Sequence, residues 1–188
     1  MTDNLSHEAK ALAIAKKQLD IIRNVTAELN KFSNLQTKLN NILRILDEQF
    51  GIAHSMILLP DQAMENLSVY ARRGYPEADV IVPFGKGIVG MAAQRRIPLN
   101  LTGLNRKRMY VHATSHLKGE AELSFPHIQH SESQIAIPLL SNNELIAVLT
   151  AESLTPSVFN TEEEKLLLTL TTHITISIQN SMLYDSME

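Results

Sequence analysis

Residues 134–152 read QIAIPLLSNNELIAVLTAE, and this stretch decides the fold class. Two apolar, partly β-branched runs, 134–140 and 144–152, are separated by Ser141-Asn142-Asn143. A connection of this length, made of turn-forming residues, is typical of a β-hairpin. The pattern therefore predicts two adjacent antiparallel strands at the centre of the domain.

The segment after the hairpin predicts a long helix. Asn160 is a good N-cap residue, and the acids that follow it, 162–164, lie in the first turn, where the helix dipole favours negative charge. No Gly or Pro ends the pattern before Glu188, so we expect a connection to a further domain or a shortened chain. The apolar positions on one stripe are Leu167, Leu170, Ile174, Ile178 and Met182.

Between the N-terminal segment and the hairpin, the spacing of apolar residues changes from a helical to a strand period after Gly51. Three strands are expected before a glycine-rich segment, at 53–59, 67–72 and 80–82, and an extended piece at 97–101. Gly85, Gly87 and Gly90 lead a short apolar helix, and turn geometry explains them better than phosphate binding. Residues 102–130 show no period, which predicts a long loop of the kind that forms lids or binding segments.

Two helices are expected at the N-terminus. Residues 5–32 carry a narrow apolar seam, which favours packing against one partner helix. The spacing of Ser33 and Gln36 is that of a capping box, and it predicts the start of a second helix that ends at Gly51.

The composition is that of a soluble globular protein with one domain and helical extensions. The 188 residues are 44% hydrophobic, and their formal net charge of −3 argues against nucleic acid or a membrane surface as the partner. No apolar run is long enough to span a membrane, and no export signal opens the chain, so we expect a cytoplasmic setting. The absence of cysteine excludes disulfides, thiolate metal sites and a cysteine nucleophile.

The order of these elements, over residues 35–185, resembles the GAF domain, a small-molecule-sensing module of signalling proteins. The same resemblance is carried by four short strings in the right order. They are PFGKGIVGMAA at 83–93, QIAIPL at 134–139, IAVLTAES at 146–153 and FNTEEE at 159–164.

The resemblance implies an α/β fold with a central antiparallel sheet, a ligand pocket under the long loop on one face, and terminal helices on the other. It also implies a non-catalytic regulatory domain that signals through these helices to an output domain such as a nucleotide cyclase or kinase. We expect an N-terminal signalling helix at 1–32, a GAF core at 33–160 and a C-terminal helix at 161–188. The terminal helices are expected to form a homodimer.

The ligand is expected to be a small anionic molecule. Seven Lys or Arg residues and no acid lie between Asp79 and Glu120, so the rest of the chain carries about −10. The alternative explanation for this basic segment is that its side chains are solvated and only balance the negative charge of acidic helices. A pure dimerisation module with a pocket filled by its own side chains also stays open. By position in the family fold, the ligand-binding residues are Arg95, Arg106, Arg108, Tyr110, His112, His116 and Glu152.

Several more specific activities are disfavoured. Cyclic-nucleotide-binding GAF domains carry Asn-Lys where this chain has Glu152 and Ser153, although Phe159, Glu163 and Glu164 match the rest of that motif. Free-methionine-sulfoxide reductases of this fold use cysteines, which are absent here. We therefore expect no catalytic residue and no cofactor. A metal site at the histidines is also not expected, because flanking ligands are sparse; these are His112, His116, His127 and His130.

Overall fold

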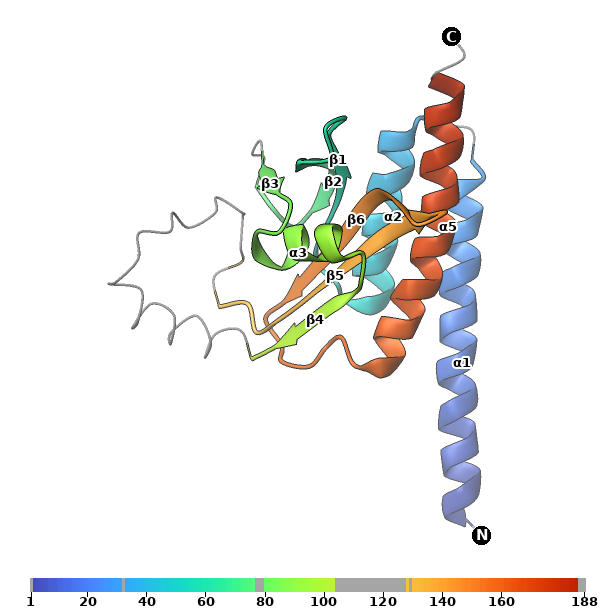
Figure 1. The fold of residues 1–188 in the computed structure, drawn as a ribbon. Coiled ribbons are helices and arrows are strands. Elements are labelled where there is room, and N and C mark those ends of the chain that lie inside the picture. The colour runs from blue at the N-terminus through green and yellow to red at the C-terminus, as the bar shows by residue number, and fades with distance from the viewer. Residues whose placement is uncertain (1, 32, 77–79, 104–127, 129, 186–188) are drawn as a thin grey trace, which may run out of the picture.

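The computed structural model describes residues 2–31, 33–76, 80–103, 128 and 130–185. Their strands form one six-stranded antiparallel sheet in the order β3-β2-β1-β6-β5-β4 (Figure 1). The strands are β1 His54–Pro60, β2 Asn66–Arg73, β3 Ile81–Pro83, β4 Leu99–Thr102, β5 Ser133–Ser141 and β6 Glu144–Ser153. The helices are α1 Thr2–Leu29, α2 Leu35–Phe50, α3 Gly87–Arg95 and α5 Thr161–Asp185.

The predicted hairpin lies near the middle of the sheet. Strands β5 and β6 pair from Ser133 opposite Ser153 to Ser141 opposite Glu144, with one register shift between Leu139 and Leu140. The turn residues Asn142 and Asn143 have φ values of 48° and 66°, a left-handed conformation that Asn tolerates better than most residues. The local sequence therefore determines this turn, as expected.

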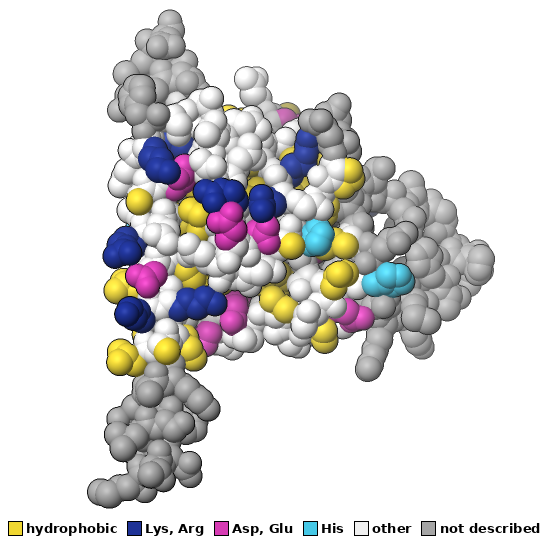
Figure 2. All heavy atoms as spheres, turned by 180° about the vertical axis from the view of Figure 1, so that it is seen from behind, with side chains coloured by type: hydrophobic (Ala, Val, Ile, Leu, Met, Phe, Trp, Pro, Cys, Tyr) yellow, Lys and Arg dark blue, Asp and Glu magenta, His cyan; other side chains and the backbone are white. Residues whose placement is uncertain are grey.

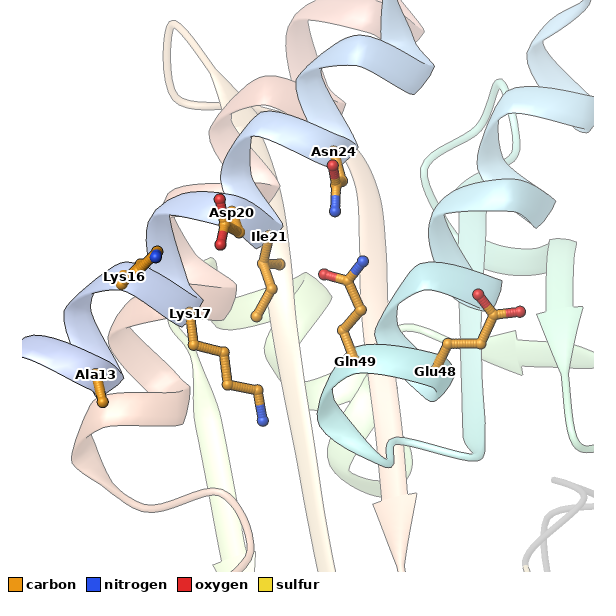
Figure 3. A pocket seen from close by; sticks show the side chains of 8 residues that line it. All are labelled: Ala13, Lys16, Lys17, Asp20, Ile21, Asn24, Glu48 and Gln49. Atoms are coloured by element: carbon orange, nitrogen blue, oxygen red, sulfur yellow. The ribbon is translucent and has the colours of Figure 1, made fainter. Parts of the chain in front are cut away.

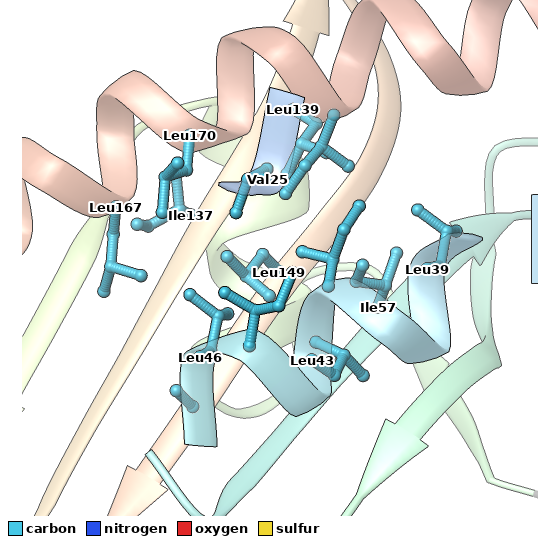
Figure 4. Close-up of a cluster of buried hydrophobic side chains, with 14 of the residues drawn as sticks. Val25, Leu39, Leu43, Leu46, Ile57, Ile137, Leu139, Leu149, Leu167 and Leu170 are labelled. Atoms are coloured by element: carbon cyan, nitrogen blue, oxygen red, sulfur yellow. The ribbon is translucent and has the colours of Figure 1, made fainter. Parts of the chain in front are cut away.

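Three helices cover one face of the sheet, and α3 lies on the other (Figure 1). This arrangement confirms the predicted fold class for the described residues. The larger cluster of buried apolar side chains fills the space between the sheet and helices α1, α2 and α5 (Figure 4). It includes Val25, Leu43, Ile57, Leu149 and Leu170, and their removal from water stabilises this layer.

Helix α1 uses only its C-terminal half for this core. Ile21, Val25 and Leu29 are buried, whereas the side chains of Leu12 and Leu19 are 72% and 66% exposed. The single seam predicted over residues 5–32 is therefore divided between a buried part and an exposed part. The N-terminal part of α1 extends past the start of α5 and away from the sheet (Figure 1).

Helix α2 begins one residue later than the capping box predicts. Asn34 is the N-cap residue, and its Oδ1 accepts a hydrogen bond of 2.8 Å from the backbone N–H of Thr37. With Asn34 as the cap, the third helical position is Thr37, so Gln36 cannot complete a capping box. Instead, Gln36 Nε2 donates to the carbonyl oxygen of Tyr70 on β2 at 2.6 Å. The prediction that Ser33 caps α2 is wrong, and the predicted end at Gly51, with φ 71°, is confirmed.

The remaining elements lie close to their predicted positions. Helix α5 begins after Asn160, whose Oδ1 accepts a hydrogen bond from the N–H of Glu162, and four of its five predicted stripe residues are buried. The fifth, Met182, is exposed. Most of the predicted loop 102–130 lies outside the described residues. Within the part of the chain that the structure describes, every helix is too short or too polar to cross a bilayer.

Candidate functional site

The sheet face on which α3 lies, here called the α3 face, is mostly apolar. Met56, Leu58 and Val148 of the central strands pack there against Val89 and Ala92 of α3. The alternation of side chains along a strand assigns the intervening residues to the opposite, helix-covered face. A polar side chain on the α3 face therefore stands out from its apolar surroundings.

A row of polar residues crosses three strands on the α3 face. Glu152 of β6 lies between His54 of β1 and Gln134 of β5, because both residues pair with it in the sheet. Thr150 lies one pleat further along β6, opposite Met56. Glu152 and Gln134 are only 1% and 2% exposed, and Thr150 is completely buried. We call His54, Gln134, Thr150 and Glu152 the polar row.

Hydrogen bonds hold part of the polar row in place. The Thr150 hydroxyl donates to the carbonyl oxygen of Ile135 at 3.0 Å, and Gln134 Nε2 lies 3.5 Å from Thr150 Oγ1. Glu152 Oε2 accepts a 3.1 Å hydrogen bond from the backbone N–H of Ile128. Since Ile128 precedes β5 at the end of the predicted loop, this bond connects that end of the loop to the α3 face.

An aromatic contact flanks the row at β1. The rings of His54 and Tyr75 meet edge to face, with centroids 5.7 Å apart and planes at 80°. Tyr75 also packs against the apolar cluster beneath α3. The row therefore groups a carboxylate, an amide, a hydroxyl and an imidazole beside an aromatic ring, and each of these four groups can form hydrogen bonds with a small polar molecule.

The structure describes two of the residues predicted to bind a ligand. Glu152 lies on the α3 face within the polar row, whereas Arg95 lies in the last turn of α3 and is exposed. Arg95 is thus not part of the buried row. The other five predicted residues lie outside the described residues: Arg106, Arg108, Tyr110, His112 and His116.

The sequence reasoning missed three members of the polar row. Gln134 and Thr150 are polar positions within otherwise apolar strands, so this interruption was a usable signal. His54, at the start of its strand, gives no such signal alone. Its place in the row depends on the pairing of β1 with β6, which the sequence does not specify.

Two hollows found in the described surface lie away from the α3 face. One, of about 560 Å³, separates α1 from the end of α2 and is lined by polar residues such as Lys17, Asn24 and Gln49 (Figure 3). The other, of about 520 Å³, lies between α2 and β2 and includes Arg72 and Arg73. Figure 2 shows positive and negative side chains interspersed among the described residues of the face seen there.

Two further candidates from the sequence are the histidine metal site and the cyclic-nucleotide motif, and the structure describes only part of the first. Of the four histidines considered for a metal, His130 alone is described, and it is exposed with a φ of 64°. His112, His116 and His127 lie outside the described residues. Among the residues that the structure does describe, no group of three potential metal-binding side chains is found.

The matching half of the cyclic-nucleotide motif lies at the start of α5. Phe159 is 2% exposed within the core on the helix-covered face. Asn100 of β4 donates to the Phe159 carbonyl oxygen at 2.7 Å and to Glu164 Oε2 at 3.0 Å. These contacts join β4 to α5, and they give Phe159 and Glu164 a structural role.

Comparisons with known proteins agree with this architecture. The GAF domain of the Acinetobacter phosphoenolpyruvate-protein phosphotransferase is 20% identical, with a TM-score of 0.73 over 88% of this chain and 95% of that chain. The corresponding GAF domain from Coxiella burnetii is 21% identical, with a TM-score of 0.72 over 92% and 98%. The free methionine-R-sulfoxide reductase from Neisseria meningitidis, in complex with its substrate, is 20% identical, with a TM-score of 0.72 over 89% and 91%.

At these identities the solved structures show a common fold and nothing more specific. No curated protein matches the sequence at a significant level. The model of the GAF domain family, however, matches residues 33–179, which is well over half of the chain. Together with the six-stranded antiparallel sheet and its covering helices, this match shows that the chain belongs to the GAF domain family.

Proposed function

We propose that this chain is a non-catalytic regulatory GAF domain that binds a small molecule on the α3 face and signals through its terminal helices. The polar row is the observation that carries the proposal. Gln134, Thr150 and Glu152 are hydrogen-bonding side chains grouped on an otherwise apolar face, and such groups orient a polar ligand in a binding site. The domain division at 1–32, 33–160 and 161–188, and an output domain such as a nucleotide cyclase or kinase, belong to the same proposal.

The proposed ligand carries an anionic group and a hydrogen-bond donor. The anionic group would be bound by the basic stretch between Asp79 and Glu120, where Arg106 and Arg108 offer bidentate guanidinium groups. The donor would face Glu152, since a carboxylate accepts several hydrogen bonds at once. Arg95, Tyr110, His112 and His116 remain proposed ligand contacts.

A thermal-shift series tests this proposal with inorganic phosphate, succinate, glutamate and AMP as probes. We expect at least one probe to raise the midpoint of unfolding by about 4 °C at tenfold its dissociation constant. The double variant R106A/R108A should lose the shift, because it removes the cationic partners. A Glu152→Gln variant should weaken only the probes that carry a donor group.

The control is Arg23→Ala, which removes an exposed basic residue from α1, on the opposite side of the sheet. This variant should respond to the probes as the unmodified chain does. If none of the four probes moves the midpoint of the unmodified chain, the anionic ligand is rejected.

We further propose that the chain forms a homodimer through α1. Leu12, Ala15 and Leu19 are exposed, and with the half-buried Ile22 they recur at spacings of three and four residues. This is the pattern that packs against a second parallel helix. Ile176 of α5 is also 52% exposed on the same helical layer. The proposed occupant of the exposed stripe is the α1 helix of a second copy of this chain.

The variant L12E/L19E should shift this dimer to monomer. The introduced carboxylates of the two copies would be buried against each other in an apolar contact. We therefore expect the dissociation constant of the dimer to rise at least about 100-fold. Sedimentation velocity over a concentration series gives the constant. Ala13→Glu adds a carboxylate on another side of α1 and should leave the dimer intact. A monomeric unmodified chain at 100 μM would overturn the dimer.

One alternative has support from the structure. Gln134, Thr150 and Glu152 of the polar row are buried and form hydrogen bonds within the chain. These facts favour a dimerisation module whose pocket is filled by its own side chains. Dimerisation together with an absent thermal shift for every probe would support this alternative over ligand sensing.

The proposal includes no catalysis. The structural neighbours include methionine-R-sulfoxide reductases, but this chain has no cysteine for the thiol chemistry that the resemblance would imply. The polar row also lacks an activated nucleophile, because the Thr150 hydroxyl donates to a backbone carbonyl.

A further inference from the structure

Arg72 and Arg73 are the only Lys or Arg residues in the six described strands. They are neighbours on β2, so the alternation of side chains along a strand sends them to opposite faces of the sheet. Arg73 faces helix α2, where its Nε and Nη2 each lie 2.6 Å from Asp47 Oδ2. Arg72 is therefore the basic residue that the strands place on the α3 face.

The pairing of β2 with β1 gives the same face for Arg72. Arg72 lies directly opposite Met56, whose side chain packs beneath α3. Side chains directly opposite each other in antiparallel strands point to the same face of the sheet. Met56 in turn lies opposite Thr150 of the polar row. Arg72 is therefore at the level of Thr150, and His54 follows on β1 one pleat away.

A β-bulge in β2 determines which arginine reaches the α3 face. Val69 packs in the apolar cluster under α3, whereas Ala71 belongs to the cluster under the other helices, so side chains two positions apart have changed face. The pairing with β1 shifts at the same point and leaves Tyr70 as the extra residue. Without the bulge, regular alternation would direct Arg73 to the α3 face in place of Arg72.

The outer edge of β2 gives access to Arg72, which is half-buried. Among the described strands, β3 is the neighbour on this side, and it pairs only with residues 66–68 of β2. The hollow of about 520 Å³ lies along this edge rather than on the α3 face, so residues of both faces border it. They include Val69, Tyr70, Arg72 and Arg73.

Arg72 and Glu152 carry opposite charges on the same face. They belong to β2 and β6, which lie on either side of β1. With neighbouring strands about 4.8 Å apart and a rise of about 3.4 Å per residue, their Cα atoms are about 12 Å from each other. His54 occupies the strand between them, with its ring against that of Tyr75. This arrangement suits a small molecule with a negative group at one end and a positive group at the other.

Both charged groups have hydrogen-bonding capacity for a ligand. Arg72 and Glu152 also interact with other parts of the chain, and Glu152 Oε2 accepts from the backbone N–H of Ile128. A guanidinium group, however, has five N–H donors, and a carboxylate has about four acceptor sites. A bidentate contact with an anionic group at Arg72 and a charge-assisted hydrogen bond at Glu152 can therefore be added to these interactions.

We propose that the ligand of the α3 face is a zwitterion, whose anionic group binds Arg72 and whose ammonium group binds Glu152. This inference rests on the proposed function, and it adds Arg72 to the basic residues named there. It also makes the donor that faces Glu152 a cation. A carboxylate that is only 1% exposed gains more from a partner that balances its charge than from a neutral donor.

Two matched pairs of probes test the ammonium group: aspartate with succinate, and glutamate with glutarate. Within each pair the compounds differ only in the α-ammonium group. Calorimetric titration at pH 7 gives the dissociation constants directly, so the comparison does not depend on the stability of a variant. We expect the unmodified chain to bind at least one amino acid about tenfold or more tightly than the matching diacid. Equal affinities within both pairs would overturn the proposal.

The neighbouring arginine provides a matched control for Arg72. Arg72→Gln should weaken binding of the amino acid about tenfold or more. Arg73→Gln removes the same charge from the opposite face and should change the dissociation constant less than about twofold. If Arg72→Gln does not fold, Arg72→Lys answers the same question, because it keeps the charge but loses the bidentate fork and should still weaken binding. Equal dissociation constants for the Arg72 and Arg73 variants would count against the assignment of Arg72.

Glu152→Gln should abolish the preference for the amino acid over its diacid. The amide oxygen of the new side chain can still accept from the N–H of Ile128, so the hydrogen bond that holds this segment is retained. The control is Glu144→Gln, which removes the other carboxylate of β6 at an exposed position beside the hairpin turn. A preference that survives in Glu152→Gln would show that the ammonium group binds elsewhere.

The outcome is distinguishable from failure of the sensing proposal. If none of the four acids binds but inorganic phosphate or AMP raises the unfolding midpoint, the zwitterion is rejected and small-molecule sensing stands. If binding depends on Arg106 and Arg108 but not on Arg72, the inference fails and the anionic ligand stands. The absence of a shift with every probe of the thermal series would reject both.

Discussion

Replacing Gly90 by Ala should cost about 3 kcal/mol of unfolding free energy, because α3 and β3 leave no room for a methyl group. A Cβ at this position would lie 2.2 Å from the carbonyl oxygen of Pro83 and 3.3 Å from the amide nitrogen of Gly85. Both are backbone atoms, which cannot turn aside as a flexible side chain can. Urea denaturation at a single protein concentration measures the loss.

Gly87→Ala is the matched control for this experiment. Gly87 lies three residues earlier in the same helix with φ 59°, but a Cβ there would meet no atom within 4 Å. Its cost should be that of a left-handed residue alone, about 1 kcal/mol. If the two variants lose equal stability, the close approach of α3 to β3 is not what excludes a larger side chain at position 90.

The expected damage in Gly90→Ala reaches the candidate site. Val89 and Ala92, on either side of Gly90, pack on the sheet beneath α3. A displacement of α3 would open this apolar cluster and expose the α3 face to water. Amide exchange in β6 should therefore accelerate more in Gly90→Ala than in Gly87→Ala, even after both rates are corrected for global stability.

Local signals predicted much of this fold. The hairpin around Asn142 and the start of α5 after Asn160 depend on neighbours in sequence, and both are found where they were expected. The start of α2 was misplaced because Ser33 and Asn34 are both good caps. The choice between them depends on which residue takes the extended conformation, and here Asn34 does, with ψ 158°.

Contacts between distant segments limited the remaining predictions. The helical period of α1 does not show which of its turns meet the sheet, so exposed Leu12 and buried Val25 look equivalent in the sequence. The polar row has the same origin: His54 and Gln134 are 80 positions apart and meet only because β1 and β5 both pair with β6. Glu152 was predicted from its position in the family fold, and charge counting alone would have passed over it.

Phe159→Ala is expected to have the largest effect of the substitutions considered, a loss of about 4 kcal/mol. The Phe159 ring is 2% exposed and belongs to the core between the sheet and the helices. Its carbonyl oxygen also accepts the hydrogen bond from Asn100, so the backbone at the start of α5 is held beside β4. Removing the ring would leave a cavity at the junction where α5 is attached.

Leu154→Ala provides the control, since Leu154 is 54% exposed in the loop before α5 and should lose less than about 0.5 kcal/mol. Urea denaturation of both variants at equal concentration gives the comparison. A loss below 1 kcal/mol for Phe159→Ala would contradict the structural role. A large loss would instead show that Phe159 serves the attachment of α5, where Asn100 of β4 binds both the Phe159 carbonyl oxygen and Glu164.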